Sequence, residues 1–129
     1  MTAARSNPDF INGVPELLTL QLLARRPMYG YELVRAIETC TGQDLEFGEG
    51  CIYPVLHRLE QQGALQSRRE LVNGRGRVVY RATPAGRKKL AVSTAAWRHV
   101  VRAVDQVLQG DCLRGDGLRG GKDGRPAGA

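Results

Sequence analysis

The sequence predicts a mainly α-helical (α+β) fold in which three helices precede a two-stranded hairpin and one long helix follows it. Apolar residues recur at helical spacing in four segments, and side chains alternate in the manner of strands on both sides of an Asn-Gly pair. The 129 residues suffice for one domain with a real core. We divide the chain into an arm over residues 1–12, a domain over 13–83, a helix over 84–109 and a glycine-rich, disordered tail over 110–129.

The first two helices are predicted from leucine-rich and mixed apolar stripes. The first covers residues 14–26 and has Pro15 in its first turn, where proline is well tolerated. The second is expected to start after Gly30, which breaks the chain, and to end near Gly42, a plausible C-terminal cap. The linker that follows is expected to contain one short strand around residues 45–47.

The third helix, over residues 48–63, is predicted to have two faces. One is an apolar stripe made of Ile52, Val55, Leu56 and Leu59. Off that stripe, toward solvent, fall the side chains of Tyr53, His57, Arg58 and Gln61. These groups donate hydrogen bonds, and no carboxylate is expected among them. This composition suits a helix that enters a DNA major groove. For this segment alone, an ordinary amphipathic surface helix is the alternative.

Strand-like alternation follows over residues 64–72 and 77–83. The connecting turn, Asn73 to Gly76, begins with Asn-Gly, the strongest short hairpin signal. It carries Arg75, and Arg77 lies just inside the return strand. Three helices followed by a hairpin with a cationic tip are the layout of a winged helix-turn-helix, whose tip reaches phosphates or the minor groove. A solvated arginine-rich turn is the alternative.

Positive charge is concentrated in this part of the chain. The net charge is +6, and the segment 57–89 alone holds nine basic and two acidic side chains, a net of +7. This distribution favours a polyanionic partner such as double-stranded DNA. A winged-helix adaptor for protein–protein contacts is the main rival, but an adaptor has no need for such a concentration of cations.

Other functional classes are disfavoured. The sequence has no nucleophile elbow, no phosphate-binding glycine loop and no paired metal ligands, so we predict neither an enzyme nor a cofactor. Its three cysteines, Cys40, Cys51 and Cys112, lack metal-ligand spacing and are expected to be reduced thiols. No signal-peptide core or membrane-length apolar run is present, which predicts a cytoplasmic location without membrane contact.

The last helix is predicted to begin with a capping hydroxyl at Thr83 and a proline in its first position, although Gly86 is expected to weaken its start. Apolar and small residues then recur at intervals of four and three, as in a coiled-coil seam: Leu90, Thr94, Trp97, Val101, Val104 and Leu108. This stripe needs a partner, namely the first helix, another copy or both. We favour a homodimer whose two-fold symmetry matches a palindromic operator with half-sites about 34 Å apart.

Three motifs occur in order: PMYGYEL at 27–33, GEGCIYPVLHRLEQQGAL at 48–65 and RVVYRATPAGRKKL at 77–90. Together with the first helix, over roughly residues 14–108, the sequence resembles the PadR family of bacterial transcriptional regulators, in its smaller subgroup with a single C-terminal helix. The resemblance implies a dimeric repressor, held together by its last and first helices, that releases its operator when a small molecule binds or conditions change.

The predicted DNA-contacting residues are Cys51, Tyr53, His57, Arg58, Gln61, Arg75 and Arg77. The resemblance also implies a site for a small, flat aromatic effector at the dimer centre that uses Trp97. We predict that Ser93, Val101 and Leu18 contribute to this site; for Trp97, interface packing is an equal alternative. Cys51 stands where the family usually has threonine or serine. A thiol near a helix N-terminus can have a lowered pKa, which admits a redox-sensing regulator as another alternative.

Overall fold

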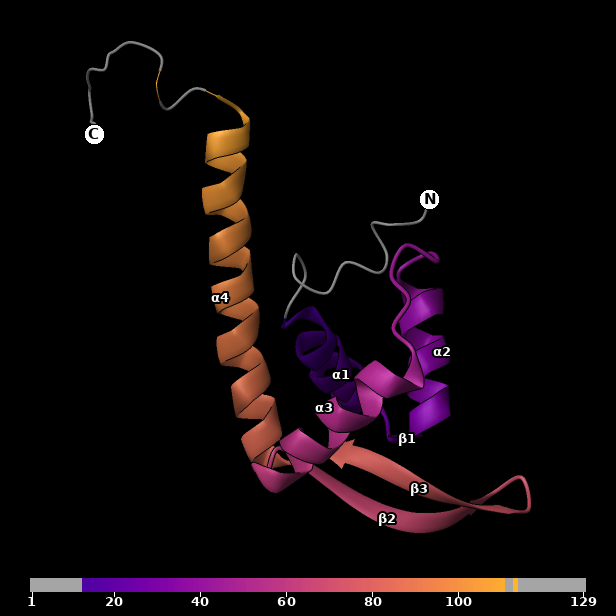
Figure 1. The fold of residues 1–129 in the computed structure, drawn as a ribbon. Helices are drawn as coiled ribbons and strands as arrows, with labels where there is room; N and C mark the ends of the chain where they lie inside the picture. The colour runs from indigo at the N-terminus through magenta and orange to yellow at the C-terminus, as the bar shows by residue number, and fades with distance from the viewer. Residues whose placement is uncertain (1–12, 111–112, 114–129) are drawn as a thin grey trace. The chain divides into compact units, whose positions relative to one another are not determined.

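The computed structural model describes residues 13–110 and 113, and in this part of the chain four helices and three strands are formed. In order they are α1 (Val14–Arg25), β1 (Met28–Tyr29), α2 (Gly30–Cys40), α3 (Glu49–Gln61), β2 (Leu65–Val72), β3 (Arg75–Ala82) and α4 (Pro84–Leu108) (Figure 1). The predicted fold class, three helices, a hairpin and one long helix, is confirmed. The predicted arm and almost all of the predicted tail lie outside the described residues.

The chain divides into two compact units, with the boundary inside α4 between Ser93 and Thr94. The first unit contains α1 to β3 and the start of α4, and the second contains the remainder of α4. Among the described residues, no helix is both long enough and apolar enough to cross a membrane.

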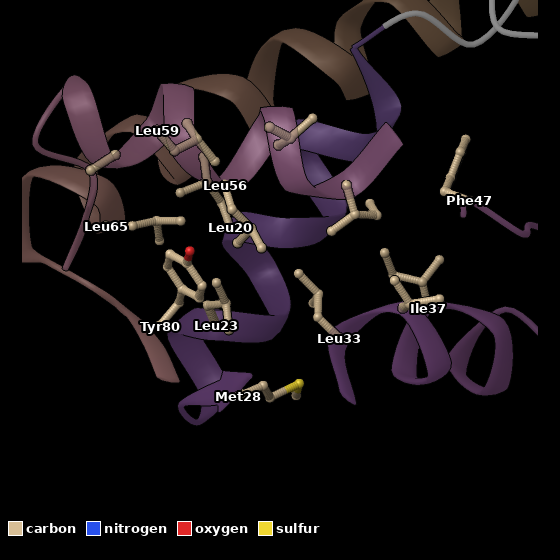
Figure 2. Close-up of a cluster of buried hydrophobic side chains, with 14 of the residues drawn as sticks. Leu20, Leu23, Met28, Leu33, Ile37, Phe47, Leu56, Leu59, Leu65 and Tyr80 are labelled. Carbon is tan, nitrogen blue, oxygen red and sulfur yellow. The ribbon is translucent and has the colours of Figure 1, made fainter. Parts of the chain in front are cut away.

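The core of the first unit lies between its helices and the hairpin. Figure 2 shows Leu20 and Leu23 of α1, Leu33 and Ile37 of α2, and Leu56 and Leu59 of α3 gathered with Leu65 and Tyr80 of the hairpin. All four residues of the apolar stripe predicted for α3 are buried: Ile52, Val55, Leu56 and Leu59. Burying one such side chain contributes about 1.5–3 kcal/mol, so this stripe fixes which face of α3 remains outside.

The strand predicted around residues 45–47 is wrong. This segment is irregular, and it contributes Leu45 and Phe47 to the core from a loop. A strand forms instead at β1, where Met28 pairs with Tyr80 and Tyr29 with Val79. The resulting antiparallel sheet has the order β1-β3-β2. Gly30 does not break the chain before α2 but is the first residue of that helix.

The hairpin β2–β3, which we call the wing, closes through a two-residue turn. Val72 pairs with Arg75, so only Asn73 and Gly74 lie between the strands. Both have positive φ angles, 52° and 79°, as a type I′ turn requires. The turn is therefore shorter than predicted, since Arg75 already belongs to β3. Residues two apart on a strand point to the same side of a sheet, so Arg75 and Arg77 share one face of the wing.

The start of α4 is held by the predicted hydroxyl cap. The backbone N–H of Gly86 donates to Oγ1 of Thr83 over 3.0 Å, and that hydroxyl donates to the carbonyl oxygen of Gly63 over 2.6 Å. The backbone N–H of Thr83 also donates to the carbonyl oxygen of Ala64. These bonds fix the first turn of α4 to the loop between α3 and β2.

Candidate nucleic-acid interface

One face of α3 is exposed along its whole length. Gly50, Pro54, His57 and Gln61 recur at the spacing of a single helical face and are all exposed; we call them the outer stripe. Two of the predicted DNA contacts, His57 and Gln61, therefore lie where the sequence placed them. At the start of α3, the N-cap residue is Gly48, which has no side chain to cap the helix. The backbone N–H groups of Cys51 and Ile52 both donate to the carbonyl oxygen of Gly48.

Tyr53 lies on the flank of α3 that faces α2, not toward open solvent as predicted. Its half-buried ring packs against the core, and a Cβ placed on Gly30 would collide with the end of that ring. The ring of His57 is its neighbour, with centroids 6.2 Å apart. Glycine at position 30 therefore makes room for Tyr53, and packing is the role that the structure shows for this ring.

Arg58 lies on the opposite flank, next to α1. Its Nη2 donates to Oε1 of Glu16 over 3.1 Å, and the other carboxylate oxygen of Glu16 lies 3.4 Å from Nζ of Lys89. Arg58 is thus exposed, as predicted, but its guanidinium is paired with a carboxylate of α1 that the sequence pattern did not reveal. The partner was not evident from the sequence because Glu16 is 42 residues away.

Cys51 is exposed in the first turn of α3, close to the outer stripe. Partial desolvation raises the pKa of its thiol above the ordinary value. Desolvation therefore works against the lowered pKa on which the redox alternative depends, because a raised pKa leaves less of the reactive thiolate.

The two arginines of the wing differ in their surroundings. Arg75 is exposed at the end of the hairpin, next to the turn. Arg77 is half-buried, and its guanidinium carbon lies 4.6 Å from the centroid of the Tyr29 ring, a cation–π arrangement. Arg77 therefore ties the wing to β1, a contact that the sequence analysis did not predict.

Several cations of the segment 57–89 are thus used within the protein: Arg58, Arg77, Arg81, which pairs with Glu70, and Lys89. Within this segment, the exposed cations for which the described residues offer no ion-pair partner are Arg68, Arg69, Arg75, Arg87 and Lys88. Arg68 and Arg69 on β2 were not among the predicted contacts. In the sequence, these two arginines were noted only as part of the positive charge of the segment 57–89.

The residues predicted to bind a ligand are distributed over both units. Leu18 is half-buried on α1 and packs against the core, and Ser93 is half-buried on α4. Trp97 and Val101 are 46% and 37% exposed on α4. None of the four lines an open hollow of about 630 Å³ beside α2, whose lining includes Leu22 and Met28. No group of three or more metal-ligating side chains is found among residues 13–110.

Comparison with known proteins places this arrangement in a family. Residues 19–92 match the model of the transcriptional regulator PadR-like family. Over 55 residues the chain is 51% identical to the transcriptional regulator Rv3488 of Mycobacterium tuberculosis, a match that covers 43% of this chain and 51%, about half, of that protein.

Solved structures agree. A transcriptional regulator from Clostridium thermocellum superimposes with a TM-score of 0.71 at 28% identity, covering 76% of this chain and 96% of the other. A PadR family transcriptional regulator from Eggerthella lenta gives a TM-score of 0.68 at 28% identity, covering 79% and 88%. With more than half of its length matched by the family model, the chain belongs to the PadR-like family of transcriptional regulators, which are not enzymes.

Proposed function

We propose that the protein is a cytoplasmic, homodimeric repressor that binds a palindromic operator through α3 and the wing and releases it when a small aromatic ligand binds. In this proposal residues 13–83 contact DNA and residues 84–109 form the dimer. The observation that carries it is the exposed apolar face of α4, to which Trp97, Val100, Val101, Val104, Val107 and Leu108 contribute.

A second copy is the partner that best suits this face. Apolar residues follow a coiled-coil-type seam, and contiguous apolar patches on a protein surface mark interaction sites. Pairing two copies about a two-fold axis would place two α3 helices in successive major grooves, roughly 34 Å apart.

The proposed DNA contacts follow from exposure and charge. His57 and Gln61 on the outer stripe would face the groove, with Cys51 and the hydroxyl of Tyr53 at its edge. Arg75 would contact the backbone from the wing, because most protein–DNA hydrogen bonds go to phosphate and sugar. Arg58 would reach a phosphate after leaving Glu16, and Arg77 would contribute mainly by holding the wing.

Dimer formation can be tested with a matched pair of substitutions on α4. Val104 belongs to the seam, whereas Val92 is also an exposed valine of α4 but falls outside it. We expect Val104→Glu to sediment as a monomer and to lose binding to the DNA upstream of its own gene, while Val92→Glu remains dimeric and bound. A dimeric, DNA-binding Val104→Glu variant would refute the proposed interface, and a wild-type chain that ignores duplex DNA at low salt would favour the adaptor alternative.

The effector can be tested through fluorescence. Trp97 is the only tryptophan of the sequence, so its emission reports on this position alone. We propose that Trp97 and Val101, with Ser93 and Leu18, bind a flat aromatic compound. Saturable quenching by planar aromatics that also lowers operator affinity would support this site. Trp97 is instead interface packing if a varied panel produces no quenching.

A further inference from the structure

We propose that Glu16 limits the DNA affinity of this protein by holding Arg58, and that binding of a duplex transfers Arg58 from Glu16 to a backbone phosphate. This inference rests on the proposed function, because it requires α3 to contact DNA. Glu16 lies on α1 and therefore acts on the duplex through Arg58, as a positioning residue.

The three side chains involved come from three different helices. Arg58 of α3 and Lys89 of α4 each contact a different oxygen of the Glu16 carboxylate, at 3.1 Å and 3.4 Å. Arg58 and Lys89 keep 49% and 37% of their side chains exposed, whereas Glu16 keeps only 23%. The carboxylate is thus the enclosed centre of the group, and Arg58 is its most exposed member.

This geometry makes an exchange of partners favourable. An ion pair this exposed adds little stability, whereas a phosphate can accept two parallel hydrogen bonds from the planar guanidinium of arginine. When Arg58 leaves, Lys89 remains on the second oxygen of Glu16, so the carboxylate keeps a cationic partner. The arrangement therefore avoids the penalty of leaving a partly enclosed charge unpaired.

Arg58 is also in a suitable place to move. It follows His57 of the outer stripe directly and lies one helical turn before Gln61 and Gln62, so a small change in its side-chain torsions would carry the guanidinium from the α1 flank toward the proposed DNA face. A held arginine lowers binding to every duplex alike, because a phosphate contact carries no sequence information.

The test is a double-mutant cycle between Glu16 and Arg58, with DNA binding followed by fluorescence anisotropy at low and moderate salt. The probes are the duplex upstream of the protein's own gene and a random duplex of equal length. We expect Glu16→Gln to bind both duplexes about 1.5- to 5-fold more tightly, which corresponds to an arginine released from one exposed pair. Arg58→Ala should remove that gain in the Glu16→Gln background while costing much less in the wild type.

Two further variants distinguish loss of the Glu16–Arg58 contact from a general loss of negative charge. Glu49→Gln removes a carboxylate in the first turn of α3, and we expect any gain from it to persist in Arg58→Ala. Glu16→Asp keeps the charge but shortens the reach to Arg58, and we expect it to reproduce part of the Glu16→Gln gain. Thermal unfolding of each variant confirms that it is folded. The proposal is overturned if Glu16→Gln and Arg58→Ala act additively or if neither Glu16 variant gains affinity, whereas absence of duplex binding by the wild type overturns the proposed function itself.

Discussion

Gly86 in the first turn of α4 lies directly against the backbone of Ala64, in the loop that leads from α3 into the wing. A Cβ placed on Gly86 would collide with the carbonyl oxygen of Ala64, and that oxygen also accepts the backbone N–H of Thr83. The glycine is therefore a point of close approach that lets α4 start beside this loop. The expectation that Gly86 merely weakens the helix is replaced by a packing role.

Gly86→Ala is expected to destabilise the protein by about 1–3 kcal/mol, although alanine is the better helix former, because the colliding atom belongs to backbone and cannot rotate away. Urea unfolding followed by circular dichroism measures this change. Gly50→Ala is the matched control: it lies in α3 with open space around its position and should gain up to about 1 kcal/mol. Equal effects of the two substitutions would contradict the packing argument.

The parts of the fold that depend on local spacing could be predicted from the sequence. Three features depend only on residues close to one another in the sequence. They are the apolar stripe of α3, the Asn73-Gly74 turn and the hydroxyl cap at Thr83. The strand β1 could not be predicted, because two residues carry no alternation and their conformation depends on pairing with Tyr80 and Val79.

The same distinction applies to the candidate site. Exposure of His57 and Gln61 follows from helical spacing and was predicted. Tyr53 and Arg58 were assigned to the DNA face for the same reason, and Arg77 was assigned from its place beside the wing turn, yet each packs against or contacts a residue distant in sequence: Gly30, Glu16 and Tyr29 respectively. Residue spacing predicts which side of a helix a side chain occupies. It does not predict which residue, distant in sequence, a side chain at the edge of that side will contact.

Arg75→Ala is expected to weaken binding to all duplexes and to reduce the slope of log K against log salt by about one, since one phosphate contact is lost. Its stability should not change, because Arg75 is exposed at the end of the wing. Anisotropy titrations at several salt concentrations measure the slope. An unchanged slope would exclude Arg75 from the phosphate contacts.

Arg77→Ala is expected to behave differently from its neighbour and to lower the free energy of unfolding by about 0.5–2 kcal/mol, because the cation–π contact with Tyr29 is removed. Urea unfolding measures the loss. In a Tyr29→Leu background the same substitution should cost less, since the ring is already absent. A stable Arg77→Ala variant with a reduced salt slope would instead make Arg77 a plain DNA contact.

Gly74→Ala is expected to cost about 1–2 kcal/mol, because alanine is strained at the left-handed φ of 79° that the wing turn requires. Gly76→Ala serves as the control. Its φ is not positive, and a Cβ there would meet only the end of the Arg69 side chain at an ordinary 3.5 Å. Comparable losses at both positions would argue against a turn-specific effect.

We expect the buried side chain of Tyr80 to make the folded state less stable at alkaline pH. Its side chain is only 4% exposed, and burial, followed by the charges of Glu60 and Tyr53, raises the pKa of its hydroxyl above the ordinary value of about 10. Above that pH the unfolded chain loses this proton while the folded chain retains it, so the folded state binds more protons and its stability falls as the pH rises. The contribution is fully present below about pH 10 and is lost as the pH rises through the folded-state pKa.

Urea unfolding between pH 8 and pH 11, within about the range where tyrosine titrates, measures this effect. Tyr80→Phe cannot ionise at this position, so its stability should fall less steeply above about pH 10 than that of the wild type. Tyr31→Phe, at a side chain that is 45% exposed, should leave the wild-type profile unchanged. Parallel pH profiles for the wild type and Tyr80→Phe would mean that the alkaline loss of stability arises from groups other than Tyr80.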